Sequence, residues 1–409
     1  MARVLAYTSP AKGHLFPLIP ILDELAGRGH RIAVRTLASE VPLMRDLGFA
    51  ADPIDHRVES IELQDWRVRN PQKALAASVR AFVERAPFDA RDLERAVHEE
   101  QADVVLVDIN SWGALAAAEK WGGPWAALCP YPLALGSRDV PPFGPGLAPG
   151  RGPLGALRDA LLRPIVHGAL QRQMLPPLNG VRQNLGLAAL TSFDEMFGRA
   201  PLLISTTAEP FEYHRNDWPD NVLMVGPCEW DPPAETPDWI SDLDRPLVLV
   251  TTSSEFQDDG RLVEVALQAL AEEPFEVVAT VPSAHVPSEI PDNARVETFL
   301  PHAALLDRAV CAVTHGGMGA TQKALAHGVP VCAVPFGRDQ PEVARRLQIS
   351  GAGTRLPARR LSPGRLRAKV TEAIGLRDGA ARVAAGFRNA GGPSAAASAI
   401  ENRLLLATS

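Results

Sequence analysis

Short apolar runs alternate with longer amphipathic stretches along the whole chain. The runs are rich in Val, Leu, Ile and Ala, and polar residues or glycine flank them. Continuous apolar runs of this kind are typical of parallel strands buried on both faces, and one-sided stretches such as residues 15–26 indicate helices packed on a sheet. The pattern predicts an α/β protein with doubly wound sheets. Predicted strands include residues 4–7, 31–36, 103–108, 221–227, 246–252, 310–314 and 329–336.

A chain of 409 residues is long enough for two such domains. Residues 221–227 read as the last strand of an N-terminal domain, 1–227. Residues 228–237 are rich in proline and acidic side chains, which is typical of a linker. A C-terminal domain, residues 238–385, would follow.

Charge and composition limit the classes of function that we expect. The net charge of −7 gives no support for binding nucleic acid or an anionic membrane. The four cysteines lack the spacing of a metal site and fit buried thiols. No signal peptide or membrane-length apolar run is visible, so we expect a cytoplasmic enzyme.

Glycines follow the predicted strand 310–314 at once. His315, Gly316, Gly317 and Gly319 lead into a predicted helix, residues 320–327. A glycine turn that opens a helix after a parallel strand presents free N–H groups and the positive end of the helix dipole, so it can bind an anion. The spacing fits neither the dinucleotide fingerprint nor the nucleotide-hydrolase phosphate loop. A turn used only for packing is equally typical of this pattern.

Two titratable side chains are predicted at one edge of the first sheet. His14 follows the strand at residues 4–7, and Asp108 ends the strand at residues 103–108. Ligands of open α/β sheets bind at this carboxyl edge, and a carboxylate beside an imidazole can orient a general base. On residue type alone, a surface-loop histidine and a helix-capping aspartate remain alternatives. Asp103 lies at the opposite edge.

Taken together, these motifs resemble a known family. The segment from His315 to Thr321, Gly328-Val329-Pro330, the pair Asp339-Gln340, and Gly13-His14 with Pro17 are similar to the signatures of nucleotide-sugar-dependent glycosyltransferases. The branch includes plant secondary-metabolite and bacterial antibiotic glycosyltransferases. This resemblance implies the GT-B fold, in which two Rossmann-like domains face each other across a cleft, and a C-terminal helix, residues 386–409, that returns to the N-terminal domain.

The resemblance also assigns roles. It implies that His14 is the catalytic base and Asp108 its partner, and that the donor is a dTDP-sugar or UDP-sugar. The implied donor-binding residues are Ser254, Phe299, Leu300, His302, His315, Gly316, Gly317, Gly319, Ala320, Thr321, Asp339 and Gln340. Two positions depart from the family pattern: Ser253 replaces a glycine, and Lys323 replaces a glutamate that binds ribose. Lysine cannot accept a hydrogen bond, so either Gln322 replaces that contact, the sugar is a deoxysugar, or Lys323 faces solvent.

For the acceptor, the resemblance implies an apolar pocket. Candidate walls are Trp66, Phe82, Trp112 and Phe143, although each is also typical of a core. The expected reaction is inverting transfer to a hydroxyl or aromatic carbon of a hydrophobic natural product. Asp242 and Asp244 precede a strand, so we expect no metal and no cofactor. A nucleotide-sugar epimerase or hydrolase, or a non-catalytic auxiliary subunit, remains an alternative. We expect a monomer or homodimer.

Overall fold

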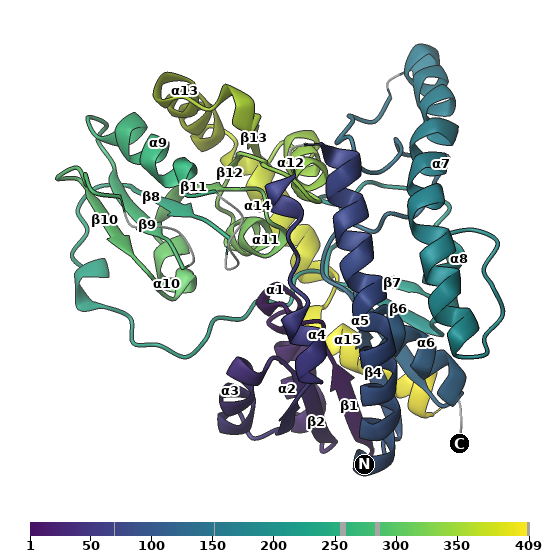
Figure 1. Ribbon diagram of the computed structural model, residues 1–409. Coiled ribbons are helices and arrows are strands. Elements are labelled where there is room, and N and C mark those ends of the chain that lie inside the picture. Colours follow the sequence, from purple (N-terminus) through teal and green to yellow (C-terminus); the bar gives the residue numbers. More distant parts are fainter. Residues whose placement is uncertain (69, 151, 254–258, 283–286, 407–409) are drawn as a thin grey trace.

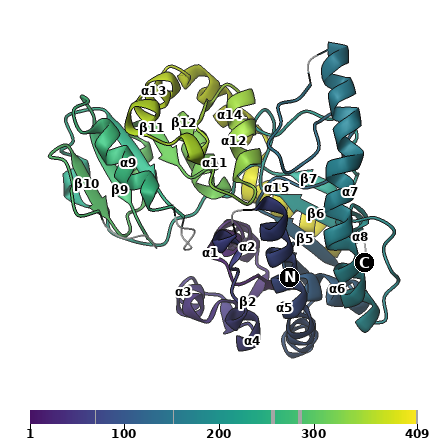
Figure 2. The same ribbon diagram turned by 45° about the horizontal axis from the view of Figure 1, so that its top comes forward.

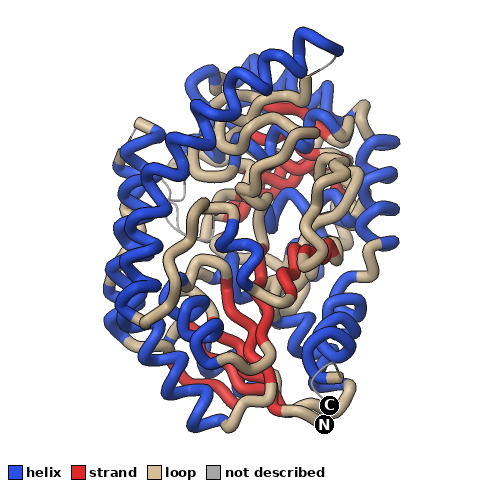
Figure 3. Tube along the Cα trace, turned by 90° about the vertical axis from the view of Figure 1, so that its right-hand side faces the viewer, coloured by secondary structure: helices blue, strands red, loops and turns tan. Residues whose placement is uncertain are grey.

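Two parallel sheets make up the computed structural model, which describes residues 1–68, 70–150, 152–253, 259–282 and 287–406. Figure 3 shows the two groups of strands, one near the termini and one toward the opposite end of the molecule. Helices flank both sheets (Figure 1). The α/β class and the paired doubly wound domains predicted from the sequence are confirmed.

The N-terminal sheet has seven strands in the order β3-β2-β1-β4-β5-β6-β7. Alternate residues of β1 face opposite cores: Leu5 and Tyr7 pack in one hydrophobic cluster, and Val4 and Ala6 in the other. The strands are β1 Arg3–Tyr7, β2 Arg31–Thr36, β3 Ala50–Pro53, β4 Val104–Asp108, β5 Trp125–Cys129, β6 Leu202–Ser205 and β7 Val222–Met224.

Helices of this domain include two long ones, α5 (Pro71–Glu100) and α7 (Gly152–Asn184). α5 packs so closely on α6 that only glycine fits at residue 113 of α6. A Cβ there would lie 1.9 Å from the carbonyl oxygen of Ala86 in α5. The others are α1 Lys12–Leu15, α2 Ile19–Gly27, α3 Val41–Asp46, α4 His56–Ser60, α6 Trp112–Trp121 and α8 Glu195–Arg199, with short 3₁₀ turns η1 Ala38–Glu40 and η2 Asp65–Arg67.

The C-terminal sheet has six parallel strands in the order β10-β9-β8-β11-β12-β13. They are β8 Leu247–Thr251, β9 Glu276–Thr280, β10 Ala294–Glu297, β11 Ala309–Thr314, β12 Val331–Ala333 and β13 Gly353–Arg355. The helices are α9 Arg261–Leu270, α10 His302–Leu306, α11 Met318–Ala326, α12 Gln340–Ile349, α13 Pro363–Ile374 and α14 Arg377–Asn389, with η3 Asp238–Ile240 and η4 Ala358–Arg360.

The last helix, α15 (Gly392–Ile400), packs against α2 of the N-terminal domain. Ile400 is fully buried in that domain's core, and the turn after it, Glu401–Leu405, adds Leu404. Glu401 accepts a hydrogen bond from Arg28 at 2.7 Å. Figure 1 shows this yellow segment beside the purple N-terminal elements. The chain thus crosses between the domains twice.

Residues of the N-terminal half also enter the C-terminal core. Phe211, which follows β6, is fully buried there, and its ring centroid lies 5.9 Å from that of Phe387. Figure 2 shows the two domains side by side, joined along one flank. In the part of the chain that the structure describes, no helix combines the length and apolarity needed to span a bilayer.

Candidate active site

His14 and Asp108 form a close pair at the carboxyl edge of the N-terminal sheet. β1 and β4 are neighbours, so the loop after β1 passes beside the end of β4. Nδ1 of His14 lies 3.0 Å from Oδ1 and 2.8 Å from Oδ2 of Asp108. Asp108 is buried, whereas the His14 side chain keeps 17% of its surface exposed. This geometry leaves the imidazole within reach of a ligand.

The carboxylate of Asp108 is held in its ionised form. Burial raises its pKa, but the charge of His14 and hydrogen bonds from His14, the Asn110 backbone and Ser9 outweigh that effect, so the pKa lies below its ordinary value. An ionised Asp108 accepts the Nδ1–H of His14. The lone pair of that tautomer is then on Nε2, the nitrogen that a general base uses.

In the C-terminal domain, the predicted glycine turn links β11 to α11. Gly316 has φ of +84°, a conformation that favours glycine. A Cβ at Gly317 would lie 2.2 Å from Nε2 of His315, so the imidazole occupies the space of that side chain. Gly317 caps α11 without a side-chain hydrogen bond. The first N–H groups of α11 therefore have no side-chain cap, as an anion site requires.

Two buried polar atoms at this turn have no hydrogen-bond partner among the described residues. They are Nδ1 of His315 and Nε2 of Gln322. Burial, with the nearby charge of Arg338, lowers the pKa of His315 to about 4, so its ring is neutral at pH 7. Nε2 of Gln322 is a donor, whereas Nδ1 of His315 is a donor or an acceptor depending on the tautomer. Buried polar atoms without partners are costly in a folded protein, so their position beside an uncapped helix end fits a polar ligand.

The other candidate residues on α11 differ in solvent exposure. Gly319 is exposed and a Cβ there would meet nothing within 4 Å, while Ala320 is half-buried. Thr321 is fully buried, its hydroxyl lies 3.4 Å from that of Thr314, and its N–H bonds to the Gly317 carbonyl. The expectation that Thr321 contacts the donor is therefore corrected: the residue serves the packing of α11 on β11.

The segment expected to hold the nucleobase follows β10. The Phe299 side chain is 45% exposed, whereas the Leu300 side chain is buried in the core and leaves only its backbone for a ligand. His302 begins α10, and its Nε2 lies 2.9 Å from the hydroxyl of Thr280. Burial, together with the charge of Lys323, lowers the pKa of His302 to about 4. Ser254 lies outside the described residues.

Lys323 does not face solvent, so that alternative is wrong. Its Nζ donates to the carbonyl of Trp230 at 2.8 Å and pairs with the carboxylate of Asp231 in the linker. The other oxygen of Asp231 accepts the backbone N–H of Ala303 at 3.3 Å. A carboxylate is thus present beside His302, supplied by the linker and not by α11.

Asp339 directly precedes α12, and Gln340 is the first residue of that helix. Removal from water raises the pKa of the half-buried Asp339, and the charges of Arg338 and His14 oppose that rise. The side-chain oxygen of Gln340 accepts the N–H groups of Phe336 and Gly337 at 2.7 and 3.0 Å, which fixes the turn before α12.

The four aromatic candidates for the acceptor pocket divide into two groups. Trp66 and Phe143 are half-buried on irregular segments. Phe82 of α5 packs 5.5 Å from Trp112, centroid to centroid. Trp112 is only 2% exposed and belongs to the core between α5, α6 and the sheet. Its expected acceptor contact is corrected, since a side chain enclosed on all sides cannot form a pocket wall.

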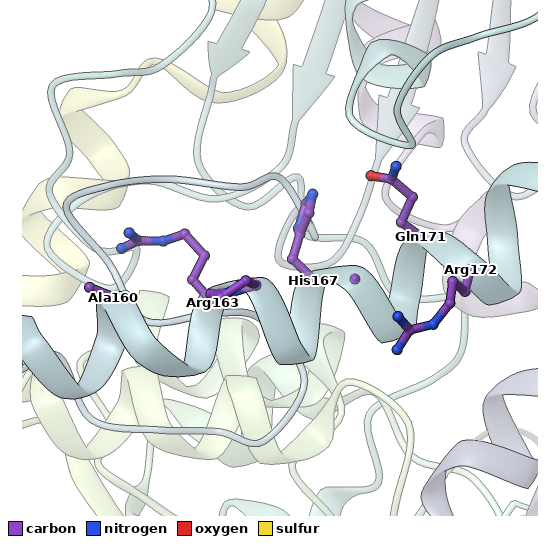
Figure 4. Close-up of a pocket in the computed structure, with 7 residues that line it drawn as sticks. Ala160, Arg163, His167, Gln171 and Arg172 are labelled. Carbon is purple, nitrogen blue, oxygen red and sulfur yellow. The ribbon is translucent and has the colours of Figure 1, made fainter.

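Phe143 lines a small cavity with Leu135 and with His167 and Leu170 of α7. A larger open depression of about 500 Å³ lies along α7 itself, between Ala160 and Arg172 (Figure 4). Arg163 and His167 border both. Neither hollow includes His14 or the glycine turn.

Comparison with known proteins identifies the family of the chain. Residues 264–402 match the family described as Erythromycin biosynthesis protein CIII-like, C-terminal domain. The 4'-demethylrebeccamycin synthase of Lentzea aerocolonigenes is 34% identical over 386 residues, which cover 90% of this chain and 91% of that protein. The chain belongs to the antibiotic glycosyltransferase family. The resemblance drawn from its motifs is confirmed.

More distantly similar proteins are also glycosyltransferases. The demethyllactenocin mycarosyltransferase of Streptomyces fradiae is 27% identical, with 99% of this chain and 87% of that protein covered. The crystal structure of the glycosyltransferase VinC in complex with dTDP superposes with a TM-score of 0.74 over 99% of this chain and 100% of that one, at 20% identity. The calicheamicin glycosyltransferase CalG4 gives the same TM-score at 22% identity. These structures show the GT-B fold.

Three residues of this glycosyltransferase escaped the sequence analysis. The Ser9 hydroxyl donates to Asp108 at 2.7 Å. The Asn110 side-chain nitrogen lies 3.3 Å from Nε2 of His14, and the Tyr131 hydroxyl donates to the side-chain oxygen of Asn110 at 2.8 Å. Ser9 follows β1, Asn110 follows β4 and Tyr131 follows β5. Because ligands of open α/β sheets bind at the carboxyl ends of the strands, these positions could have been selected from the sequence.

In the described residues of the glycosyltransferase, no group of three His, Cys, Asp or Glu side chains is arranged to hold a metal ion. What the arrangement offers chemically is a base in one domain and uncapped helical N–H groups in the other.

Proposed function

We propose that this glycosyltransferase moves a sugar from a nucleoside diphosphate to an apolar natural-product acceptor, with inversion at the anomeric carbon. The observation that carries the proposal is the pairing of His14 with an ionised Asp108 at 2.8 Å. The paired imidazole keeps 17% of its side-chain surface exposed at the edge where ligands bind, and its Nε2 also lies 3.3 Å from the side-chain nitrogen of Asn110. No other histidine among the described candidates has both a buried carboxylate partner and access to solvent.

In this mechanism, Nε2 of His14 takes the proton from an acceptor hydroxyl. The freed oxygen electrons form a bond to the anomeric carbon, and the bond from that carbon to the diphosphate oxygen breaks on the opposite face. Asp108 stabilises the imidazolium that results, because its carboxylate accepts the Nδ1–H. An aromatic acceptor carbon could be activated by the same base.

The leaving diphosphate acquires negative charge as the bond breaks. The N–H groups at the start of α11 and the neutral ring of His315 are the donors proposed to stabilise it. Donors fixed by the fold need not reorganise during the reaction. Asp339 and Gln340 are proposed to orient the sugar, since they begin α12 beside the same turn. No metal is assigned to this step.

The nucleotide is proposed to be dTDP or UDP. Support for dTDP comes from two proteins of the same fold, VinC and SsfS6, whose crystal structures contain dTDP (thymidine diphosphate). The exposed Phe299 ring would stack on the base. We propose that the Asp231 carboxylate, which pairs with Lys323, accepts from the ribose hydroxyls in place of the glutamate that Lys323 replaces.

A donor-by-acceptor screen tests the proposal. The protein is incubated with dTDP-sugars or UDP-sugars, with and without polycyclic aromatic or macrolide acceptors, and products are measured by mass spectrometry. The expected result is an acceptor mass increased by one sugar, with inverted configuration by NMR. Sugar release or epimerisation without acceptor would favour a hydrolase or epimerase. Nucleotide binding without any turnover would favour an auxiliary subunit.

A further inference from the structure

Two N-terminal segments that carry proposed acceptor contacts are anchored to the C-terminal domain. Trp66 lies in η2, and Phe143 lies in the long connection between β5 and α7. Neither segment is a strand, so the N-terminal sheet does not fix them through strand pairing. The start of the β5–α7 connection is held within the N-terminal domain, where Ser137 and the Arg138 backbone donate to Asp217. Asp65 and the turn at residues 144–146 instead make polar contacts to α12 and to the turn before it, which also carries Asp339 and Gln340.

The first anchor joins Arg338 to Asp65. Nε and Nη2 of Arg338 donate to the two oxygens of Asp65, both at 2.8 Å. Asp65 is only 6% exposed, and 273 residues separate the two. Paired parallel hydrogen bonds of this kind fix orientation as well as distance. Arg338 adopts φ of +52°, so its backbone is also in an unusual conformation.

The second anchor joins Glu342 to the turn at residues 144–146. One carboxylate oxygen of Glu342 accepts the N–H groups of Gly144 and Gly146, both at 2.8 Å. Arg345 donates to the carbonyl of Gly146 at 2.8 Å. Gly146 has φ of +60°, and a Cβ there would lie 2.4 Å from the carbonyl oxygen of Pro341. The turn therefore fits against α12 only with glycine at this position.

Glu342 itself is held rigidly. Its second oxygen accepts from Arg346 at 2.9 Å, and Arg346 donates to Glu212 of the N-terminal half at 2.8 Å. All three residues are at most 5% exposed. A buried ion network of this kind contributes little net stability but demands one geometry. The position of the turn at residues 144–146 is thus specified by α12.

We propose that Arg338 and Glu342 are positioning residues for the acceptor. They lie within three positions of Asp339 and Gln340, so the turn that orients the donor sugar also sets both acceptor walls. The inference rests on the proposed function. Neither residue takes part in the chemistry; each fixes a segment that contacts the acceptor.

The test compares kinetic constants for donor and acceptor. Glu342→Ala removes both N–H contacts of the turn and should raise the acceptor KM at least about tenfold, with donor KM nearly unchanged. Glu342→Gln keeps one oxygen for the two N–H groups but turns its NH₂ group toward Arg346, so it should restore only part of the loss. Asp65→Asn should raise the acceptor KM less, because the isosteric amide keeps one acceptor oxygen. Asp103→Asn, which breaks a similar pair with Arg3 away from the cleft, is the matched control.

Hydrogen exchange gives a readout independent of turnover. The amides of Gly144 and Gly146 should exchange faster in Glu342→Ala than in the wild type, with protection elsewhere retained. If acceptor KM is unchanged in Glu342→Ala and Asp65→Asn while the wild type transfers sugar, the inference is overturned and the proposed function stands. An equal rise in donor KM also overturns it. If the wild type transfers no sugar, the proposed function fails first, and this inference with it.

Discussion

Nδ1 of His14 lies 2.8 Å from Oδ2 of Asp108, although 94 residues separate them in the chain. Adjacent strands β1 and β4 bring them together, and Ser9 and Asn110 hold the carboxylate from either side. The pair thus belongs to the rigid part of the fold. Its role can be tested without disturbing the donor domain.

Asp108→Asn should abolish most catalysis without unfolding the protein. The amide can donate to Nδ1 and so favour the tautomer that carries its proton on Nε2, which cannot act as a base. We expect kcat to fall by about 10²–10⁴, with the dissociation constant for the nucleotide unchanged. Steady-state kinetics and nucleotide titration measure both quantities. A variant with normal kcat would mean that Asp108 does not orient the base.

A pair of glycine substitutions separates ligand contact from folding. Gly319→Ala meets no protein atom within 4 Å and replaces glycine inside a helix, so thermal stability should be kept or rise by up to about 1 kcal/mol. If the diphosphate approaches the backbone there, the added methyl should weaken nucleotide binding. Gly317→Ala collides with His315 and should lower both stability and binding. Unchanged nucleotide affinity in Gly319→Ala would place the diphosphate elsewhere.

The free energy of unfolding should depend on pH, because burial lowers the pKa values of two histidines and raises that of one aspartate. The pKa values of His302 and His315 are lowered to about 4, so the unfolded chain binds more protons between pH 4 and 6.5, and stability falls as pH drops through that range. Burial raises the pKa of Asp89 to about 8, so its contribution is lost as pH rises from about 4 to 8. A maximum near pH 6.5 follows.

Urea unfolding across this pH range measures the effect. In His315→Asn, the slope of the unfolding free energy against pH should fall by up to about 1.4 kcal/mol per pH unit between pH 4 and 6.5. Asp89→Asn should remove the decline above pH 6.5. Identical pH profiles for both variants and the wild type would show that these residues titrate alike in the folded and unfolded chains.

The return of the C-terminal segment should stabilise the N-terminal domain. Ile400 is fully buried in that core, so Ile400→Ala should cost about 2–5 kcal/mol of unfolding free energy. Leu406→Ala is the control, because that side chain is 64% exposed. Thermal melts of the two variants make the comparison. Equal melting temperatures would indicate that α15 does not contribute to the core.

Local patterns predicted much of this structure. The run before His14 and the glycines after Thr314 each specify a strand and the turn that ends it, so the fold and the two sides of the cleft follow from short segments. Phe299 is exposed and the Leu300 side chain is buried, and their expected contacts with the nucleobase stay predictions. Trp112 and Thr321 were misassigned, since residue type does not reveal which side of a helix faces the core.

Contacts between domains could not be predicted in this way. Arg338 and Asp65 carry no periodic signal that links them, and their pairing depends on how the two sheets are placed. The same holds for Lys323, whose partner Asp231 comes from the linker. Such pairs are fixed by three-dimensional packing, and only a structure identifies them.

The most direct test of the central claim is His14→Ala. Single-turnover transfer and nucleotide titration should be measured on this variant and on the wild type, with the donor and acceptor identified by the screen. We predict that the transfer rate falls by about 10² or more while nucleotide affinity stays within twofold of the wild type. A variant that transfers sugar at the wild-type rate would contradict the assignment of His14 as the base.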